Sequence, residues 1–405
     1  MPEGRDAEPA IELRDKVAII GVGETNYALD YRAAREGANT GDHAPREPMT
    51  LAREAFERAA RDAGLAPHEV DGLSLTFLYG GPTPEEVASH LGIALHYVLP
   101  REGLQSGILV PLAAAVRALA TGACQTMALV YAVASRSIGR RYGGQTYQGA
   151  GPGSYYYYHP WGWSSQAAHW AVIFQHYMAT YGVEERDLGA IAATLRESAT
   201  LNDNAIMRQP LSIDEYLTSR YIVRPLHLFD LCLVNDGGVC LILRRADAAS
   251  DSPHSPVLVS GWGHTEVHHS KMHYMVKEGL RPQFEAAGEQ ASTMGGIARS
   301  EIDHFQGYDA STVFLLNQIE GYGFVKVGEG LDFAKEGHLR IGGLLPSNTN
   351  GGMLSEAYMH GWNNLVESVR QLRHEAGIRQ VNGAETSMFS VATTESAHPV
   401  ILRRA

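Results

Sequence analysis

The chain repeats itself, and this repetition constrains the fold more than any single motif. Three segments of the first half return in the second half in the same order and at similar offsets. The pairs are residues 17–25 with 257–265, 64–71 with 296–303 and, less sharply, 122–125 with 377–380. One such match arises easily by chance, whereas three collinear matches indicate a duplicated unit. Because 405 residues are too many for one small core, we expect two similar halves.

Each half alternates short apolar runs with longer segments of helical periodicity. In the first half the pattern predicts strands at residues 17–21, 73–77, 127–133 and 238–243, and helices at residues 51–63 and 111–121. The second of these helices is nearly uncharged, which predicts burial on all sides. Strands that alternate with helices form layered α/β structures. Two such halves packed together predict an α-β-α-β-α sandwich with a central pair of buried helices.

A long excursion interrupts the first half. Residues 137–224 are too many for a simple connection, and they include a helix with aromatic side chains along one face. We therefore predict a cap subdomain laid over the core. The resulting division is a disordered tail at 1–15, an N-terminal half at 16–136 and 225–250, the cap at 137–224, and a C-terminal half at 251–405.

Composition narrows the class of protein. The net charge is −12, so binding to nucleic-acid phosphates is not expected. No apolar run approaches the length of a membrane span, and the acidic, polar start of the chain does not resemble a signal peptide. The three cysteines show no zinc-type spacing and sit in apolar stretches, as small core residues do. We expect a cytoplasmic protein.

The turn at Gly21 and Gly23 invites comparison with dinucleotide-binding loops. It lacks the third glycine of the GxGxxG pattern, and no acidic residue closes a following strand at the right distance. A nicotinamide cofactor is therefore not expected.

Four motifs resemble the thiolase superfamily, and within it the lipid-transfer-protein branch related to sterol carrier protein X thiolases. They are residues 225–238 (PLHLFDLCLVNDGG), 308–312 (YDAST), 320–330 (EGYGFVKVGEG) and 348–361 (NTNGGMLSEAYMHG). The resemblance extends from about Lys16 to the C-terminus. It implies the duplicated five-layer thiolase sandwich with an inserted loop subdomain, and a homodimeric core.

The chain departs from thiolases at the positions that carry their chemistry. Tyr358 stands where the resemblance places a catalytic histidine, and Tyr308 stands where it places an asparagine. Leu104 occupies the place of the nucleophilic cysteine, and residues 383–387 lack the second cysteine. Members of the branch with this tyrosine pair resemble steroid side-chain aldolases.

That resemblance implies both a reaction and a partner. A β-hydroxyacyl-CoA steroid side chain would be cleaved to a ketosteroid and a short acyl-CoA, with a small OB-fold, zinc-ribbon protein as partner. The substrate is carried as a CoA thioester, and no other cofactor is implied. The alternative is a catalytically silent subunit that binds a lipid acyl-CoA or scaffolds a partner. A Claisen-type transferase with an unrecognised nucleophile is the third reading.

The residues suit the implied reaction. A retro-aldol cleavage needs one group to remove a hydroxyl proton and another to protonate the leaving carbon. Tyr308 and Tyr358 could do both, although a phenol with a pKa of about 10 needs nearby donors to act as a base. Backbone N–H groups of Gly351 and Gly352, or His360, could supply them. The alternative interpretation is that both tyrosines are structural, with hydroxyls that are hydrogen-bonded in the core.

Each of the other candidate site residues has two possible roles. Asp309 can orient Tyr308, or it can cap a helix that follows the strand. His360 can donate to Tyr358, or it can be a satisfied interior histidine. A dense aromatic run could bind a flat polycyclic lipid or form a protein interface. Its residues are Tyr155, Tyr156, Tyr157, Tyr158 and Trp161.

Two other aldolase chemistries are weakly supported. His264, Glu266 and His268 alternate as metal ligands on a strand would, but they follow a glycine turn. We therefore predict no metal site. Lys326 and Lys335 lie in polar, glycine-rich sequence with no apolar pocket to lower an amine pKa, so a Schiff base is not expected.

Overall fold

The computed structural model describes residues 11–36, 46–77, 82–99, 109–139, 165–266, 281–392 and 396–405. The strands are β1 (Val17–Glu24), β2 (Gly72–Phe77), β3 (Tyr97–Val98), β4 (Thr126–Ala134), β5 (Tyr221–Val223), β6 (Leu226–His227), β7 (Asp236–Arg245), β8 (Val257–Trp262), β9 (Thr265–Glu266), β10 (His304–Gln306), β11 (Thr386–Ala392) and β12 (Ser396–Arg404). The α-helices are α1 (Tyr27–Glu36), α2 (Pro48–Ala63), α3 (Pro84–Leu91), α4 (Leu109–Ala120), α6 (Gln166–Tyr181), α7 (Glu185–Thr200), α8 (Ile213–Thr218), α10 (Arg281–Gly295), α11 (Thr312–Gly321), α12 (Gly330–Lys335), α13 (Gly352–Ser355) and α14 (Trp362–Leu372). Short 3-10 helices are η1 (Ile11–Leu13), η2 (Pro67–Glu69), η4 (Leu228–Asp230), η5 (Ala246–Ala248), η6 (Arg299–Glu301) and η7 (Gly377–Arg379).

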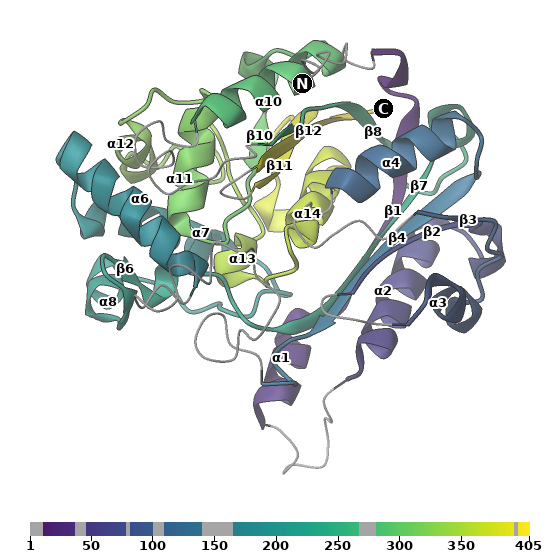
Figure 1. Ribbon diagram of the computed structural model, residues 1–405, viewed down its shortest axis with the longest axis horizontal. Helices are drawn as coiled ribbons and strands as arrows, with labels where there is room; N and C mark the ends of the chain where they lie inside the picture. The colour runs from purple at the N-terminus through teal and green to yellow at the C-terminus, as the bar shows by residue number, and fades with distance from the viewer. Residues whose placement is uncertain are drawn as a thin grey trace, which may run out of the picture.

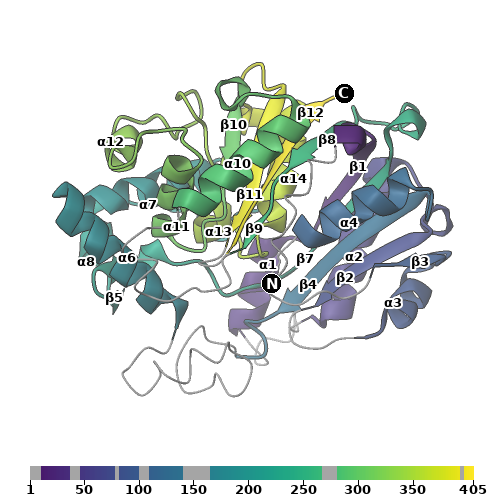
Figure 2. The same cartoon turned by 45° about the horizontal axis from the view of Figure 1, so that its top comes forward.

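The large sheet runs in the order β10-β11-β12-β8-β1-β7-β4-β2-β3, with β9 beside β12. Its two sides correspond to the two halves of the chain, and they join where β1 pairs with β8. That antiparallel seam contains only the pairs Ala18–Leu258 and Ile19–Val257. A short seam lets the two groups of strands diverge and leaves room for helices between them (Figure 2).

Helices cover the strands in layers. Helix α2 packs on β1, β4 and β7, whereas α10 packs on β8 and β12. Helices α4 and α14 each contact strands of both halves, so they form the layer between them (Figure 1). Ala115, Val116 and Leu119 of α4 are fully buried, but Arg117 is exposed, so the predicted burial on all sides is wrong for one side of this helix. The predicted α-β-α-β-α arrangement with a central helix pair is confirmed.

Paired glycines show the duplication at atomic detail. A Cβ atom added to Gly23 of β1 would overlap the carbonyl oxygen of Ala55 in α2. A Cβ atom added to Gly263, the matching position just after β8, would overlap the carbonyl oxygen of Ala287 in α10. These glycines allow each helix to approach its strand closely. Gly21 and Gly23 thus lie within β1 against a helix, so the predicted turn at these residues is wrong.

A pair of aspartates also matches, and it corrects one predicted equivalence. The carboxylate of Asp71 accepts the N–H of Thr126 at 2.8 Å, at the start of β4. The carboxylate of Asp303 accepts the N–H of Thr386 at 2.9 Å, at the start of β11. The third predicted pair of segments is therefore out of register, because its second member lies in η7, well before β11.

The structure describes only part of the predicted tail and part of the predicted cap. Residues 11–15 are ordered, since Ile11–Leu13 form η1 and Asp15 pairs with Arg403 at 2.9 Å. The prediction of disorder through residue 15 is thus wrong for these residues. Helices α6, α7 and α8 lie within the predicted cap, whose boundaries stay a prediction. Among the described residues, no helix is both long and apolar enough to cross a membrane.

Candidate active site

Two tyrosines from distant parts of the C-terminal half meet at their hydroxyl groups. The oxygens of Tyr308 and Tyr358 lie 3.0 Å apart, and either hydroxyl can donate the hydrogen bond. Each residue is 8 % exposed, so the pair is largely screened from bulk water. The structure therefore brings the two predicted catalytic residues into direct contact.

Tyr308 lies in the connection from β10 to α11, and its backbone is clamped by one amide side chain. Its N–H donates to Oε1 of Gln318 at 3.1 Å, and its carbonyl accepts from Nε2 of Gln318 at 2.7 Å. Gln318 is fixed in turn on α11, which begins after the capping residue Ser311. Because both backbone polar groups are held, the direction of the tyrosine side chain is set by a rigid element.

Tyr358 follows α13, a single helical turn that begins after a left-handed backbone segment. Gly351 and Gly352 have φ angles of 102° and 62°, which glycine adopts with little strain. The N–H of Tyr358 donates to Oδ1 of Asn235 at 2.7 Å. Asn235 lies just before β7, so the N-terminal half also helps to position this tyrosine.

His360 packs beside both phenol rings. Its ring centroid lies 5.4 Å from that of Tyr358 and 6.2 Å from that of Tyr308. Burial among these rings lowers the pKa of His360 to about 4. The imidazole is therefore neutral at physiological pH and adds no positive charge beside the tyrosines. A role for His360 as a donor to Tyr358 stays a prediction.

Asp309 binds the short helix α13, whereas the helix that follows its own strand, α11, is capped by Ser311. Oδ2 of Asp309 accepts the N–H of Leu354 in α13 at 3.1 Å, and its Oδ1 accepts from Nδ2 of Asn364 at 3.1 Å. Burial raises the pKa of Asp309 to about 6, and these hydrogen bonds limit the rise. The carboxylate thus fixes α13, and it reaches Tyr358 only through that helix.

The predicted donor role of the two glycines needs correction. The N–H of Gly351 donates to the carbonyl of Asn348 at 2.8 Å, and the N–H of Gly352 donates to Oδ1 of Asn350 at 2.9 Å. Because both groups are used within their own turn, they do not serve a phenolate. What the glycines supply is space, since a Cβ atom on Gly352 would overlap Oδ2 of Asp309.

The cysteines do not provide a thiolate. Burial raises the pKa of Cys124 to about 12, and it raises the pKa values of Cys232 and Cys240 as well. A thiol protonated at neutral pH is neither a nucleophile nor a metal ligand. None of the three is thus suited to replace the cysteine missing at Leu104, which lies outside the described residues.

The two lysines considered for a Schiff base are charged surface residues. Lys326 pairs with Glu329 at 2.8 Å, and Lys335 pairs with Asp187 at 2.9 Å. Glu329 raises the pKa of Lys326, and Asp332 together with Asp187 raises the pKa of Lys335. A protonated amine cannot attack a carbonyl, so neither lysine fits Schiff-base chemistry.

The considered metal triplet is only partly described. Nδ1 of His264 lies 2.9 Å from Nδ1 of His398, and Nε2 of His264 lies 4.0 Å from Glu266. His268 lies outside the described residues, as do the aromatic residues 155–158 and Trp161. No cluster of three or more histidine, cysteine, aspartate or glutamate side chains suited to a metal ion occurs in the described part of the chain.

Sequence reasoning missed a group of amide side chains that hold the two tyrosine loops. Asn348 accepts the N–H of Gly307 at 2.7 Å, and Asn364 donates to the carbonyl of Gly307 at 2.7 Å. Asn235 and Gln318 act on the tyrosine backbones themselves. The signal that could have revealed them is the density of asparagine around a glycine turn, at 348–350 and 363–364.

Comparison with known proteins places this geometry in context. Residues 261–404 match the family model described as thiolase C-terminal domain-like. The chain is 35% identical over 374 residues to the steroid side-chain-cleaving aldolase of Thermomonospora curvata, which covers 89% of this chain and 91% of that protein. It is 32% identical over 402 residues to the 17-hydroxy-3-oxo-4-pregnene-20-carboxyl-CoA lyase of Mycobacterium tuberculosis, covering 96% and 100% of the two chains. The solved structure of the Ltp2-ChsH2(DUF35) aldolase superposes with a TM-score of 0.85 at 32% identity, over 97% of this chain and 98% of that chain.

Proposed function

We infer that this chain, which belongs to the steroid side-chain-cleaving aldolases of the thiolase superfamily, is a carbon–carbon lyase acting on a steroid acyl-CoA. The substrate class is a β-hydroxyacyl-CoA side chain, and the products are a ketosteroid and a short acyl-CoA. The single observation that carries this proposal is the 3.0 Å contact between the hydroxyls of Tyr308 and Tyr358.

The proposed cleavage requires one proton to leave an oxygen and one to reach a carbon. A phenolate on one tyrosine takes the proton of the substrate's β-hydroxyl, and the β-carbon becomes a ketone as its bond to the α-carbon breaks. The electron pair of that bond passes into the thioester, which becomes an enolate. The second tyrosine then protonates the α-carbon and releases the short acyl-CoA.

The contact between the two hydroxyls has a role both before and after the cleavage step. Before the reaction, the protonated tyrosine donates to the phenolate, and a hydrogen bond to the charged form lowers its pKa. After the reaction the proton sits on the tyrosine that acted as the base. Transfer across the same 3.0 Å contact restores the starting state without help from solvent. No covalent intermediate forms, so the chemistry tolerates the missing cysteines.

The active assembly proposed for this chain is a homodimeric core that binds a small OB-fold, zinc-ribbon protein. Support comes from the likeness to the Ltp2-ChsH2(DUF35) aldolase, whose name includes a second component. The likeness extends over nearly all of both chains.

Removing either hydroxyl tests the proposal. The chain should be purified with its partner and supplied with a 17-hydroxy steroid acyl-CoA, and ketone release should be followed. We expect Tyr308→Phe and Tyr358→Phe to lower kcat by at least about 100-fold, because each removes a proton-transfer group. KM should change little, because both aromatic rings remain.

A matched control is Tyr322→Phe. Tyr322 is also buried, and its hydroxyl bonds to Ser390 at 2.6 Å, away from the pair. This variant should keep its kcat. Full activity in both site variants would overturn the proposal. Wild-type complex that binds the acyl-CoA but cleaves no substrate would favour the silent binding subunit instead.

A further inference from the structure

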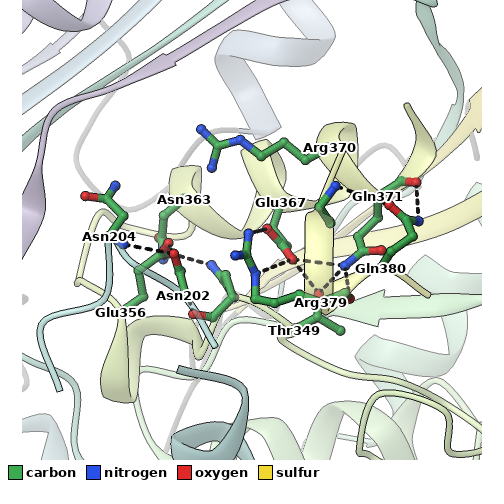
Figure 3. Close-up of polar contacts among 12 residues, drawn as sticks. Asn202, Asn204, Thr349, Glu356, Asn363, Glu367, Arg370, Gln371, Arg379 and Gln380 are labelled. Carbon is green, nitrogen blue, oxygen red and sulfur yellow. Dashed lines mark hydrogen bonds and ion pairs between the residues drawn. The ribbon is translucent and has the colours of Figure 1, made fainter. Parts of the chain in front are cut away.

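Glu356 is a buried carboxylate two residues before Tyr358. Three amide groups donate to it. Nδ2 of Asn202 lies 2.7 Å from one oxygen, and Nδ2 of Asn363 lies 2.8 Å from the other (Figure 3). Nδ2 of Asn350 donates to that second oxygen at 2.5 Å. A carboxyl group that only accepts hydrogen bonds on both oxygens has the arrangement of the ionised form. The donors come from three separate segments, so this carboxylate joins parts of the chain that would otherwise be independent.

The same amides lead on to the other tyrosine. Asn350 and Asn363 also donate to Oδ1 of Asn364, at 3.1 Å and 3.2 Å. Asn364 in turn donates to the carbonyl of Gly307 at 2.7 Å and to Asp309 at 3.1 Å. These two acceptors flank Tyr308 in the sequence. A continuous path of hydrogen bonds therefore runs from the loop of Tyr358 to both neighbours of Tyr308.

We propose that Glu356 is a positioning residue, which in its ionised form holds the loops of Tyr308 and Tyr358 together so that their hydroxyls stay in contact. The inference rests on the proposed lyase function, and it adds a residue that lies outside the tyrosine pair. Glu356 does not touch the reacting atoms, and it acts through the amides.

The charges around Glu356 determine when it is ionised. Glu24 of β1 pairs with Arg370 of α14 at 2.6 Å, and Glu367 of α14 pairs with Arg379 of η7 at 3.0 Å. Tyr27 of α1 donates to Glu24 at 2.9 Å. Each neighbouring carboxylate thus has its own guanidinium, whereas the hydrogen bonds to Glu356 come from amides. Burial, and then repulsion from Glu24, raises the pKa of Glu356 to about 8.

Protonation of Glu356 would weaken the path of hydrogen bonds at Asn363. A neutral carboxyl must donate its proton, and Oδ1 of Asn363 is a buried acceptor with no partner among the described residues. It can accept that proton if the Asn363 amide turns over, since its oxygen and nitrogen then exchange places. The turn removes the donor from Asn364, and the connection to Gly307 and Asp309 loses one of its two supports.

Kinetics across pH tests this role in the assembled complex. Wild-type kcat should rise with pH through an ionisation near 8, where Glu356 loses its proton. Glu356→Gln keeps the shape but resembles the protonated acid, because its amide donates to Asn363. We expect kcat to fall about 10- to 100-fold with KM little changed, as misplacement of reacting groups produces. The rise near pH 8 should disappear.

Two further variants separate positioning from folding. Glu356→Gln combined with Asn363→Asp returns one carboxylate to the same cluster and should recover part of kcat. Glu320→Gln alters another buried carboxylate, which receives the hydroxyl of Tyr177 at 2.5 Å at the far end of α11. That control should keep the wild-type pH profile. An E356Q profile identical to wild type, or an equal loss of kcat in Glu320→Gln, would overturn the proposal.

A crystal structure of the E356Q variant distinguishes this proposal from the lyase function on which it rests. The tyrosine oxygens should separate beyond their 3.0 Å contact, whether or not the complex cleaves a steroid. An unchanged contact would refute the positioning role even if wild-type activity is confirmed. A lost contact together with inactive wild-type complex would refute the lyase function alone.

Discussion

Asp309 shows that a residue next to a proposed catalytic tyrosine in the sequence need not bond to that tyrosine. It follows Tyr308 directly, yet its carboxylate bonds to α13 and Asn364 and not to the tyrosine hydroxyl. Gly352 provides the space that this arrangement needs. Asn364 lies 55 residues further along the chain, so nothing local to Asp309 revealed that its carboxylate binds α13 and Asn364.

Replacing Asp309 with asparagine should therefore destabilise the fold. The NH₂ group of asparagine would replace one of the two accepting oxygens, and it would face a group that is itself a donor. Either the N–H of Leu354 or the amide of Asn364 would then lose its acceptor, at a cost of about 1–3 kcal/mol. Urea unfolding at pH 7 measures the loss. Asp332→Asn, at an exposed carboxylate paired with Lys335, is the control and should change stability little. Unchanged stability with a large loss of kcat would instead indicate that Asp309 orients Tyr308.

Helix–strand pairs repeat with the same close approach in both halves. In each half a glycine at the end of the first strand meets a carbonyl group of the helix behind it, at Gly23 with α2 and at Gly263 with α10. The backbone of a helix cannot yield as a flexible side chain can. The spacing of the glycines in the sequence thus reflects a packing requirement of the duplicated unit.

Alanine at either glycine should force the helix away from its strand. Overpacking of this kind costs about 1–3 kcal/mol, and we expect Gly23→Ala and Gly263→Ala each to lose that much stability. Thermal and urea unfolding are the measurements. Gly295→Ala is the matched control, because its Cβ would meet neighbours only at 3.6 Å or beyond. Equal stability of Gly23→Ala and Gly295→Ala would contradict this account.

The whole molecule should lose stability as the pH rises above about 7.5. Unfolded Glu356 releases its proton near 4.5, whereas the folded chain keeps it until about 8. The folded state therefore holds more protons between these values, and the free energy of unfolding falls with rising pH. The buried histidines His169, His304, His360 and His398 have pKa values lowered to about 3 or 4, so their opposite effect fades only well above their unfolded value of 6.5. Asp230 and Asp309, raised to about 6, have also finished titrating.

Between about pH 7.5 and about pH 8.5 the slope should thus depend mainly on Glu356. Its contribution is at most about 1.4 kcal/mol per pH unit. Urea unfolding of wild type and Glu356→Gln at both pH values measures the difference, and the variant should show the flatter dependence. Parallel slopes would mean that Glu356 ionises in the folded chain as it does in the unfolded one. Since the proposed active form is the ionised one, activity and stability should change in opposite directions here.

Local patterns in the sequence determined the duplicated unit, the alternation of strands and helices and the largely buried central helix, whereas the two tyrosines were singled out by the resemblance to thiolases. Apolar periodicity and glycine spacing are local properties, so they can be read without coordinates. Only the tertiary structure decided that the hydroxyls of Tyr308 and Tyr358 touch, that Asp309 binds α13, and that the Gly351 and Gly352 N–H groups are already used. It alone assembled Glu356 with its asparagines. The direction of a hydrogen bond and the pKa of a buried carboxyl depend on groups tens to hundreds of residues away, and folding alone brings those groups within reach.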